Sequence, residues 1–240
     1  ISCYSSFVCT NEGTVTGNDY VGGIVGRSGA ITINRCINIG SVKGTDSNAY
    51  IGGILGNSSS TITITNCFVK ADINGTNNDY VGGIAGYCSS SSSTISSCVY
   101  YNKTNPVSVV GPRSSATPVT CFYISDKAVE GYKGYAKDSD SFKYGEVTYL
   151  LNKESGSKEI NWEQGEEYPV LSDGGEKIFR FKIAPLSVTS TVIASVAEPE
   201  GAKVFTDKIG VQSTYLNSGK IYITFSNIKD GEVLKLESTP

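Results

Sequence analysis

Histidine and methionine are both absent from the 240 residues, and tryptophan occurs once. The lack of histidine removes the commonest general base and the commonest metal ligand. A net charge of −3 excludes the basic surface that nucleic-acid binding needs. No apolar run approaches the roughly 18 residues of a membrane helix. We therefore expect no nucleic-acid partner, no membrane insertion, no metal and no cofactor.

The chain also lacks long helical patterns and begins with isoleucine. Glycine, serine, threonine and asparagine are abundant, which is typical of short strands joined by tight turns. Because methionine is missing altogether, we expect a piece of a longer protein from which any signal or anchor has been removed.

An internal repeat organises the first half of the chain. NDYVGGIVG at 18–26 returns as NAYIGGILG at 48–56 and as NDYVGGIAG at 78–86, and an eroded copy, PVSVVG, occupies 106–111. A cysteine follows each copy, and the period is about thirty residues. Such a period means one supersecondary unit per repeat, stacked on its neighbours. Since amphipathic helices are missing, we predict an all-β solenoid of about four coils, with two strand-like segments in each unit.

Alternation of side chains predicts which residues line the interior. After each cysteine the alternate positions are small or apolar, as in Cys36, Asn38, Gly40 and Val42, whereas the intervening row is mixed and suits the outer surface. Equivalent asparagines should stack as a short amide ladder. A three-residue step from isoleucine to cysteine requires a bend between two inward side chains. The candidate corners are Asn34-Arg35, Thr65-Asn66 and Ser96-Ser97.

Glycine pairs at 22–23, 52–53 and 82–83 recur in the same place in three repeats. They allow either close backbone approach or positive φ. The serine-rich loops at 28–30, 57–61 and 88–94 differ in length at one fixed place, as expected of an exposed solenoid turn.

The combined unit YVGGIVG…INRCINIGSVKG resembles the GLUG repeat of large surface and secreted proteins from gut and commensal bacteria, including IgA1-peptidase-like proteins. The resemblance covers about residues 1–125 and implies a right-handed β-helix. The fourth copy lacks the glycine pair and is interpreted as the end of the stack.

Two further regions follow the repeats. Residues 126–183 form a junction, in which DSDSFKYGEVTYLLNKE predicts one short helix capped by Asp140 or Ser141. That helix, with Trp162, Tyr168 and Leu171, would cover the end of the solenoid. In 184–240, Pro199-Glu200-Gly201-Ala202 and its flanking strands resemble the PEGA domain, which implies a small β-sandwich.

The cysteines form a regular ladder and are seven in number, so they cannot all pair within one chain. We favour buried free thiols over disulfides, and a metal site is disfavoured because no CxxC pair or histidine supports it. Cys3 and Cys88 lie off the ladder, and Cys88 is the expected exposed thiol. The members of the structural cysteine ladder are Cys9, Cys36, Cys67, Cys98 and Cys121.

Three tyrosines, Tyr20, Tyr50 and Tyr80, occupy the same place in three repeats. They form either a ligand-contact stripe for sugar rings or a partner protein, or a structural ladder that shields a sheet edge, and the structural reading is favoured. The junction also carries an acidic cluster, which suits a solvated surface better than a carboxylate pair for glycoside cleavage. Its members are Glu154, Glu159, Glu163, Glu166 and Glu167.

These features lead us to expect a non-enzymatic extracellular module of a bacterial cell-surface protein, acting in adhesion or as a rigid display stalk. No residue is expected to be catalytic, and any partner would be a host or environmental glycan or protein. One alternative is an accessory substrate-binding region of a larger secreted peptidase or glycan-active enzyme. Another is a β-helical polysaccharide lyase or hydrolase.

Overall fold

The fold is described from a computed structural model. It covers residues 9–143, 145–153 and 161–172, together with four further strands between residues 178 and 239. Cys3, Glu154, Glu159 and the PEGA-like motif at 199–202 lie outside the described residues.

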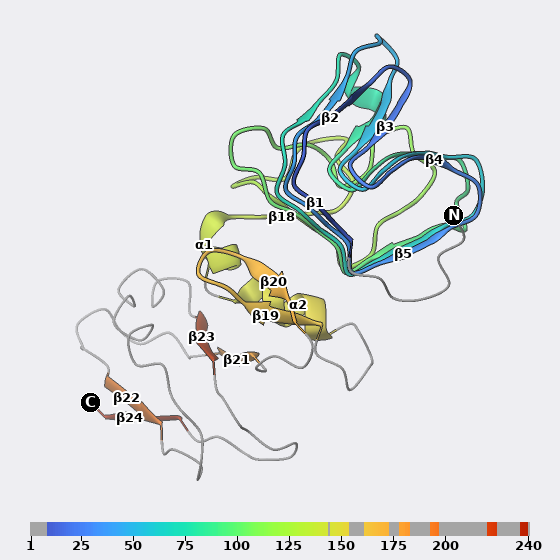
Figure 1. Ribbon diagram of the computed structural model, residues 1–240. Helices are drawn as coiled ribbons and strands as arrows, with labels where there is room; N and C mark the ends of the chain where they lie inside the picture. The colour runs from blue at the N-terminus through green and yellow to red at the C-terminus, as the bar shows by residue number, and fades with distance from the viewer. Residues whose placement is uncertain are drawn as a thin grey trace.

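Three successive coils of the chain each run through five short strands (Figure 1). The first coil contains β1 (Thr10–Asn11), β2 (Val15–Gly17), β3 (Tyr20–Gly22), β4 (Val25–Ser28) and β5 (Thr32–Asn34). The second contains β6 (Ile37–Asn38), β7 (Val42–Gly44), β8 (Tyr50–Gly52), β9 (Leu55–Ser58) and β10 (Thr63–Thr65). The third contains β11 (Phe68–Val69), β12 (Ile73–Asn74), β13 (Val81–Gly82), β14 (Ala85–Cys88) and β15 (Thr94–Ser96), with a 3-10 turn at Asn78–Tyr80.

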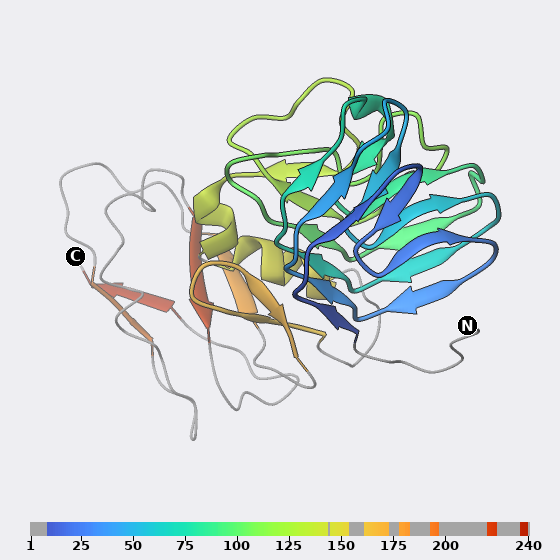
Figure 2. The same cartoon turned by 45° about the horizontal axis from the view of Figure 1, so that its top comes forward.

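Equivalent strands of successive coils pair in parallel and in register. Ile64, for example, pairs with Ile33 on one side and with Ile95 on the other. Figure 1 looks nearly along the stack, so the coils overlap, and Figure 2 shows them lying one above another. The predicted all-β solenoid is confirmed, whereas the expectation of two strands per unit is wrong.

The stack contains about three regular coils, where about four were expected. The fourth copy contributes β16 (Val99–Tyr100) and then isolated bridges from Val110 to Ala85 and Lys133 and from Val119 to Ser96. One sheet alone continues past it, in the order β1-β6-β11-β16-β17-β18, through β17 (Phe122–Ile124) and β18 (Tyr135–Lys137). We call this the long sheet.

The predicted corners are confirmed. The residue directly before each of the last four ladder cysteines has a left-handed backbone, with φ of 57° at Arg35, 52° at Asn66, 52° at Ser97 and 51° at Thr120. A non-glycine residue with positive φ is uncommon and turns the chain sharply. This turn lets the isoleucine and the cysteine on either side of it both point inward.

The interior follows the predicted alternation. Cys67, Val69 and Ile73 are buried, and so is the amide of Asn38. Asn11 Nδ2 donates to Asn38 Oδ1 at 2.8 Å, and Asn38 Nδ2 donates to the carbonyl of Gly53 at 2.8 Å. The amide ladder is therefore present and is satisfied inside the stack, where an unpaired amide would cost about 1–3 kcal/mol.

The glycine pairs serve close approach, because none of them has positive φ. A Cβ added at Gly22 would lie 2.0 Å from the carbonyl oxygen of Val25, and one at Gly52 would lie 2.0 Å from that of Leu55. A Cβ on Gly83 would lie 2.3 Å from the ring of Tyr100. The strand thus folds back on itself too tightly for any side chain.

A second layer covers the outer side of the long sheet (Figure 1). We call it the cover layer. It consists of α1 (Ser139–Lys143), α2 (Glu146–Lys153), β19 (Trp162–Gln164) and β20 (Pro169–Leu171). Trp162 is fully buried there, and Tyr168 and Leu171 pack against the same cluster.

The cover layer corrects three expectations. Two helices replace the single predicted one, because the chain turns at Gly145 with φ of 90°. Asp138 caps α1, where Asp140 or Ser141 was expected, by accepting the Ser141 N–H at 2.7 Å. Phe68 lies in the row expected to face solvent, yet it is buried because the cover layer lies over it.

Two antiparallel pairs are described in the last part of the chain. β21 (Ile178–Lys182) pairs with β23 (Lys220–Thr224), and β22 (Ile193–Val196) pairs with β24 (Leu236–Thr239). The expected boundary at 184 and the predicted sandwich stay predictions. Among the described residues, no helix is long and apolar enough to cross a membrane.

Candidate functional site

The three repeated tyrosines lie side by side on the outside of the stack, and we call them the tyrosine row. Tyr20 in β3 pairs with Tyr50 in β8, and Tyr80 ends the 3-10 turn that precedes β13. The ring centroids of Tyr20 and Tyr50 are 5.5 Å apart with the planes 17° from parallel. Tyr50 and Tyr80 are 4.6 Å apart, and Tyr87 adds a fourth ring 5.4 Å from Tyr50. The row therefore runs along the stack, one ring per coil.

An arginine lies against each end of the tyrosine row. The Arg27 guanidinium lies 4.8 Å from the Tyr20 ring centroid, and that of Arg113 lies 5.9 Å from the Tyr80 centroid. Arg113 also pairs with Asp79 at 2.8 Å. Cation–π contacts of this kind contribute about 0.5–1 kcal/mol at exposed sites.

This geometry limits what the row can bind. The faces of the Tyr50 ring meet its neighbours, and Arg27 lies over Tyr20, which is 38% exposed. Partial burial and the nearby tyrosines Tyr80, Tyr20 and Tyr87, in that order, raise the pKa of Tyr50, so its phenol stays protonated at neutral pH. The row thus presents ring edges and hydroxyl groups, while its faces are used by contacts inside the protein. A structural ladder fits this better than a platform on which a sugar ring stacks.

The five ladder cysteines lie at the same place in successive coils. Cys36, Cys67, Cys98 and Cys121 are buried, and Cys9 in the first coil is half-buried. All five are free thiols, as is Cys88. No group of three or more His, Cys, Asp or Glu residues within the described part of the chain could hold a metal ion.

Burial controls the chemistry of these thiols. Desolvation raises the pKa of Cys67 and of Cys98 well above the ordinary value. The hydrogen bond that the Cys36 thiol donates to Cys67, followed by burial, raises the pKa of Cys36. The thiolate is the reactive form of cysteine, so the inner thiols are unreactive at neutral pH.

Cys88 is buried, so the expectation that it is an exposed thiol is wrong. It ends β14, and its N–H donates to Ser114 Oγ at 3.1 Å. Burial raises the pKa of the Cys88 thiol to about 11. The prediction rested on the serine-rich loop that follows Cys88. It did not take account of Ser114, because Ser114 belongs to the irregular fourth copy and lies outside the repeated pattern.

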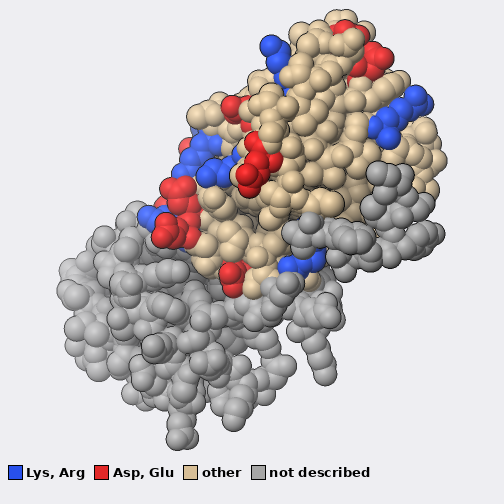
Figure 3. Space-filling model, in the orientation of Figure 1, with Lys and Arg blue, Asp and Glu red and all other residues tan. Residues whose placement is uncertain are grey.

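The acidic cluster of the junction is only partly described. Glu163 lies half-buried in β19, while Glu166 and Glu167 lie exposed in the turn between β19 and β20. The two exposed glutamates thus lie in a solvated turn. On the face that Figure 3 shows, the described surface of the solenoid is mostly uncharged, with acidic and basic side chains gathered near α1 and along the edges.

A groove beside the cover layer was not predicted. It has a volume of about 740 Å³ and is lined by residues of three separate segments, including Phe122, Tyr135 and Leu150. The spacing of residues in the sequence did not predict this groove. Its three segments come together only when β18 has paired with β17 and the two helices have packed against the long sheet.

Comparisons with known proteins give one solved structure. It is a Bacteroides ovatus protein described as a "putative immunoglobulin A1 protease", with 20% sequence identity and a TM-score of 0.52. The match covers 68% of this chain and 56% of that chain. At this identity the likeness concerns the fold. No protein-family model and no curated protein matches the chain, so the GLUG and PEGA resemblances stay predictions.

Proposed function

We propose that the chain is a non-enzymatic extracellular module of a bacterial cell-surface protein, which acts in adhesion or as a rigid stalk that displays other domains. The observation that carries the proposal is the in-register stack, in which every strand of the second coil is bonded to coils on both sides. Continuous backbone ladders resist bending and local opening, both of which a stalk must avoid outside the cell.

The extracellular location is supported by the Bacteroides ovatus neighbour. A protease of immunoglobulin A1 acts on a secreted antibody, and the shared fold makes the same location the best hypothesis for this chain. The non-enzymatic role is supported by the nature of the candidate sites. The tyrosine row uses its ring faces internally, and the inner thiols are held protonated.

The test treats intact and lysed cells of the source bacterium with proteinase K and follows this region by antibody. We expect loss of a parent protein from intact cells and a resistant fragment that corresponds to the solenoid. Digestion of the protein only in lysed cells, with no loss from intact cells, would contradict the surface location. Turnover of polysaccharides or of immunoglobulin A1 by the purified chain would contradict the non-enzymatic role.

A second candidate is an accessory substrate-binding region of a larger secreted peptidase. It is favoured by one observation, the description of the structural neighbour as an immunoglobulin A1 protease. Saturable binding of immunoglobulin A1 to the purified chain, without cleavage, would support this candidate over a stalk. A matched measurement with immunoglobulin A2 tests whether the binding is specific.

A further inference from the structure

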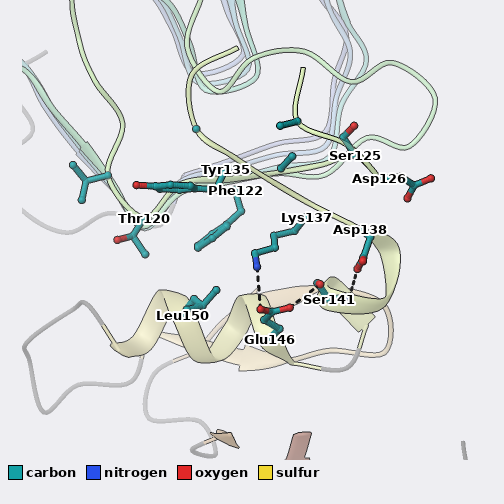
Figure 4. A pocket seen from close by; sticks show the side chains of 14 residues that line it. Thr120, Phe122, Ser125, Asp126, Tyr135, Lys137, Asp138, Ser141, Glu146 and Leu150 are labelled. Carbon is teal, nitrogen blue, oxygen red and sulfur yellow. Dashed lines mark hydrogen bonds and ion pairs between the residues drawn. The ribbon is translucent and has the colours of Figure 1, made fainter. Parts of the chain in front are cut away.

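The groove beside the cover layer lies between the last strand of the long sheet and the two helices (Figure 4). Phe122 and Tyr135 project into it from β17 and β18, and Leu150 faces them from α2. The volume of about 740 Å³ lies in the range of ligand sites, roughly 300–1,000 Å³.

Two apolar side chains are left in solvent at this groove. Tyr135 is 56% exposed and Val119 is 55% exposed, more than any other large hydrophobic residue in the described part of the chain. Both line the groove. The Phe122 ring lies 5.9 Å from that of Tyr135 and supports it from one side. Neighbouring exposed apolar groups mark interaction sites more often than isolated ones do.

Among the described residues, no strand pairs with the outer edge of β18, and all three residues of β18 line the groove. β18 is the last strand of the long sheet, and it bonds to β17 through the Tyr135 N–H to Cys121 O at 2.8 Å and the Ser125 N–H to Lys137 O at 2.9 Å. Alternate residues of a parallel strand bond to the same neighbour. Ala136 therefore directs its N–H and C=O to the other side, where the sheet ends. An extended peptide can add a strand at such an edge.

The charged residues that line the groove are three carboxylates and one lysine. Lys137 Nζ lies 2.9 Å from Glu146 Oε1, and Ser141 Oγ donates to Glu146 Oε2 at 2.8 Å, so the one lysine of the groove is matched (Figure 4). Asp126 and Asp138 also line the groove and add two further carboxylates. A ligand with positive charge complements this lining.

We propose that the groove binds an extended, basic peptide segment of a partner protein, which adds to β18 as a further strand. Its backbone bonds to Ala136, its apolar side chains pack on Tyr135 and Val119, and its lysine or arginine side chains lie near Asp126 and Asp138. The open edge favours a peptide over a glycan, because only a peptide continues the main-chain ladder. The inference does not depend on where the protein acts or on the tyrosine row.

The test uses three blocked eight-residue peptides with the full chain, followed by fluorescence anisotropy. One alternates lysine and valine, the second replaces lysine by glutamate, and the third is the first with alternate backbone amides N-methylated. We expect the lysine peptide to bind, the glutamate peptide to fail, and N-methylation to weaken binding about tenfold. Binding should also weaken as salt concentration rises.

Two variants place the binding in the groove. Tyr135→Ser removes the exposed ring, and Asp126→Asn removes a charge without touching the cap of α1. We expect each to weaken binding of the lysine peptide about tenfold, while the matched changes Tyr20→Ser and Asp19→Asn outside the groove leave it unchanged. Thermal melts confirm that each variant is folded.

Several results would overturn the proposal. Equal binding of the lysine and glutamate peptides would exclude charge recognition, and full binding of the N-methylated peptide would exclude strand addition. No binding of the lysine peptide, or unchanged binding by both groove variants, would exclude the site. Glycan-array binding that Tyr135→Ser abolishes, without peptide binding, would replace the peptide by a glycan.

Discussion

Two outer faces of the same solenoid carry aromatic side chains and protect them in different ways. On the long sheet, Phe68 and Phe122 are buried beneath the cover layer, which contributes Trp162. On the face formed by β3, β8 and β13 no such layer is seen within the described residues, and the rings of Tyr20 and Tyr50 stack on one another. The rings of the first face are covered by a segment far along the sequence, whereas those of the second are covered by residues one coil away.

The two faces are therefore stabilised in different ways: one by burial of side chains under the cover layer, the other by contacts between partly exposed rings. The cover layer buries whole side chains, and fully burying an aromatic ring contributes about 1.5–3 kcal/mol. Contacts within the tyrosine row are partly exposed and contribute about 0.5–1.5 kcal/mol for each pair beyond the area they bury. The covered face should therefore respond more strongly to loss of a single ring.

The largest effect is expected from Trp162→Ala. The side chain is fully buried between the long sheet and α2, so its removal leaves a cavity and should lower the free energy of unfolding by about 3–5 kcal/mol. Urea unfolding followed by far-UV circular dichroism measures the loss. Trp162→Phe serves as the control and should cost less, and a loss below about 1 kcal/mol for Trp162→Ala would mean that the cover layer adds little.

The second-largest effect on stability is expected from alkaline pH, which acts on the thiols that lie inside the solenoid behind the long sheet. Cys67 and Cys98 have a raised pKa in the folded state and stay protonated, whereas the unfolded thiols ionise above about 9.0. Unfolding then releases protons, so stability is unaffected below pH 9 and falls above it, by about 1.4 kcal/mol per pH unit for each thiol. Urea midpoints measured with reductant between pH 7 and pH 10 check the fall.

The matched control for the pH series is Cys67→Ser, which removes one titrating group. Its stability is lower at pH 7, but its decline above pH 9 should be shallower than that of the parent protein. Equal slopes in the two proteins would assign the alkaline loss to other groups, such as the tyrosines.

A smaller effect is expected at the tyrosine row. Tyr50 contacts Tyr20, Tyr80 and Tyr87, so Tyr50→Ala should lower the free energy of unfolding by about 1–2 kcal/mol. Tyr20→Ala removes the end of the row and should cost less than about 1 kcal/mol. Urea unfolding of both variants measures the difference, and an equal loss at the two positions would argue against a ladder.

The smallest effect concerns the corners that lead into the covered face. Thr120 is β-branched and has φ of 51°, so Thr120→Gly should relieve strain and raise stability by up to about 1 kcal/mol. Asn66→Gly is the matched comparison, because asparagine tolerates this backbone and its side chain donates to Asn34 Oδ1 at 3.2 Å. We expect a slight loss there, and differential scanning calorimetry distinguishes the two signs.

The sequence allowed prediction of features that depend on adjacent coils. The corners followed from the short step between isoleucine and cysteine, and the amide ladder from the position of Asn11 and Asn38. Burial of Phe68 could not be predicted, because the ring that covers it, Tyr168, comes from a distant segment, with ring centroids 5.2 Å apart. Strands of two to four residues are too short to show a clear period of two, so five strands per coil were interpreted as two.

The in-register stack has a consequence for how such a chain can evolve. Each repeat carries its own corner, its own tyrosine and its own glycine pair, so a duplicated unit brings the parts it needs to join the next. Gain or loss of one repeat would change the length of the rod by about 4.8 Å and leave its cross-section unchanged. Unequal recombination between similar repeats could thus change the length of the protein one coil at a time, without a new fold having to arise.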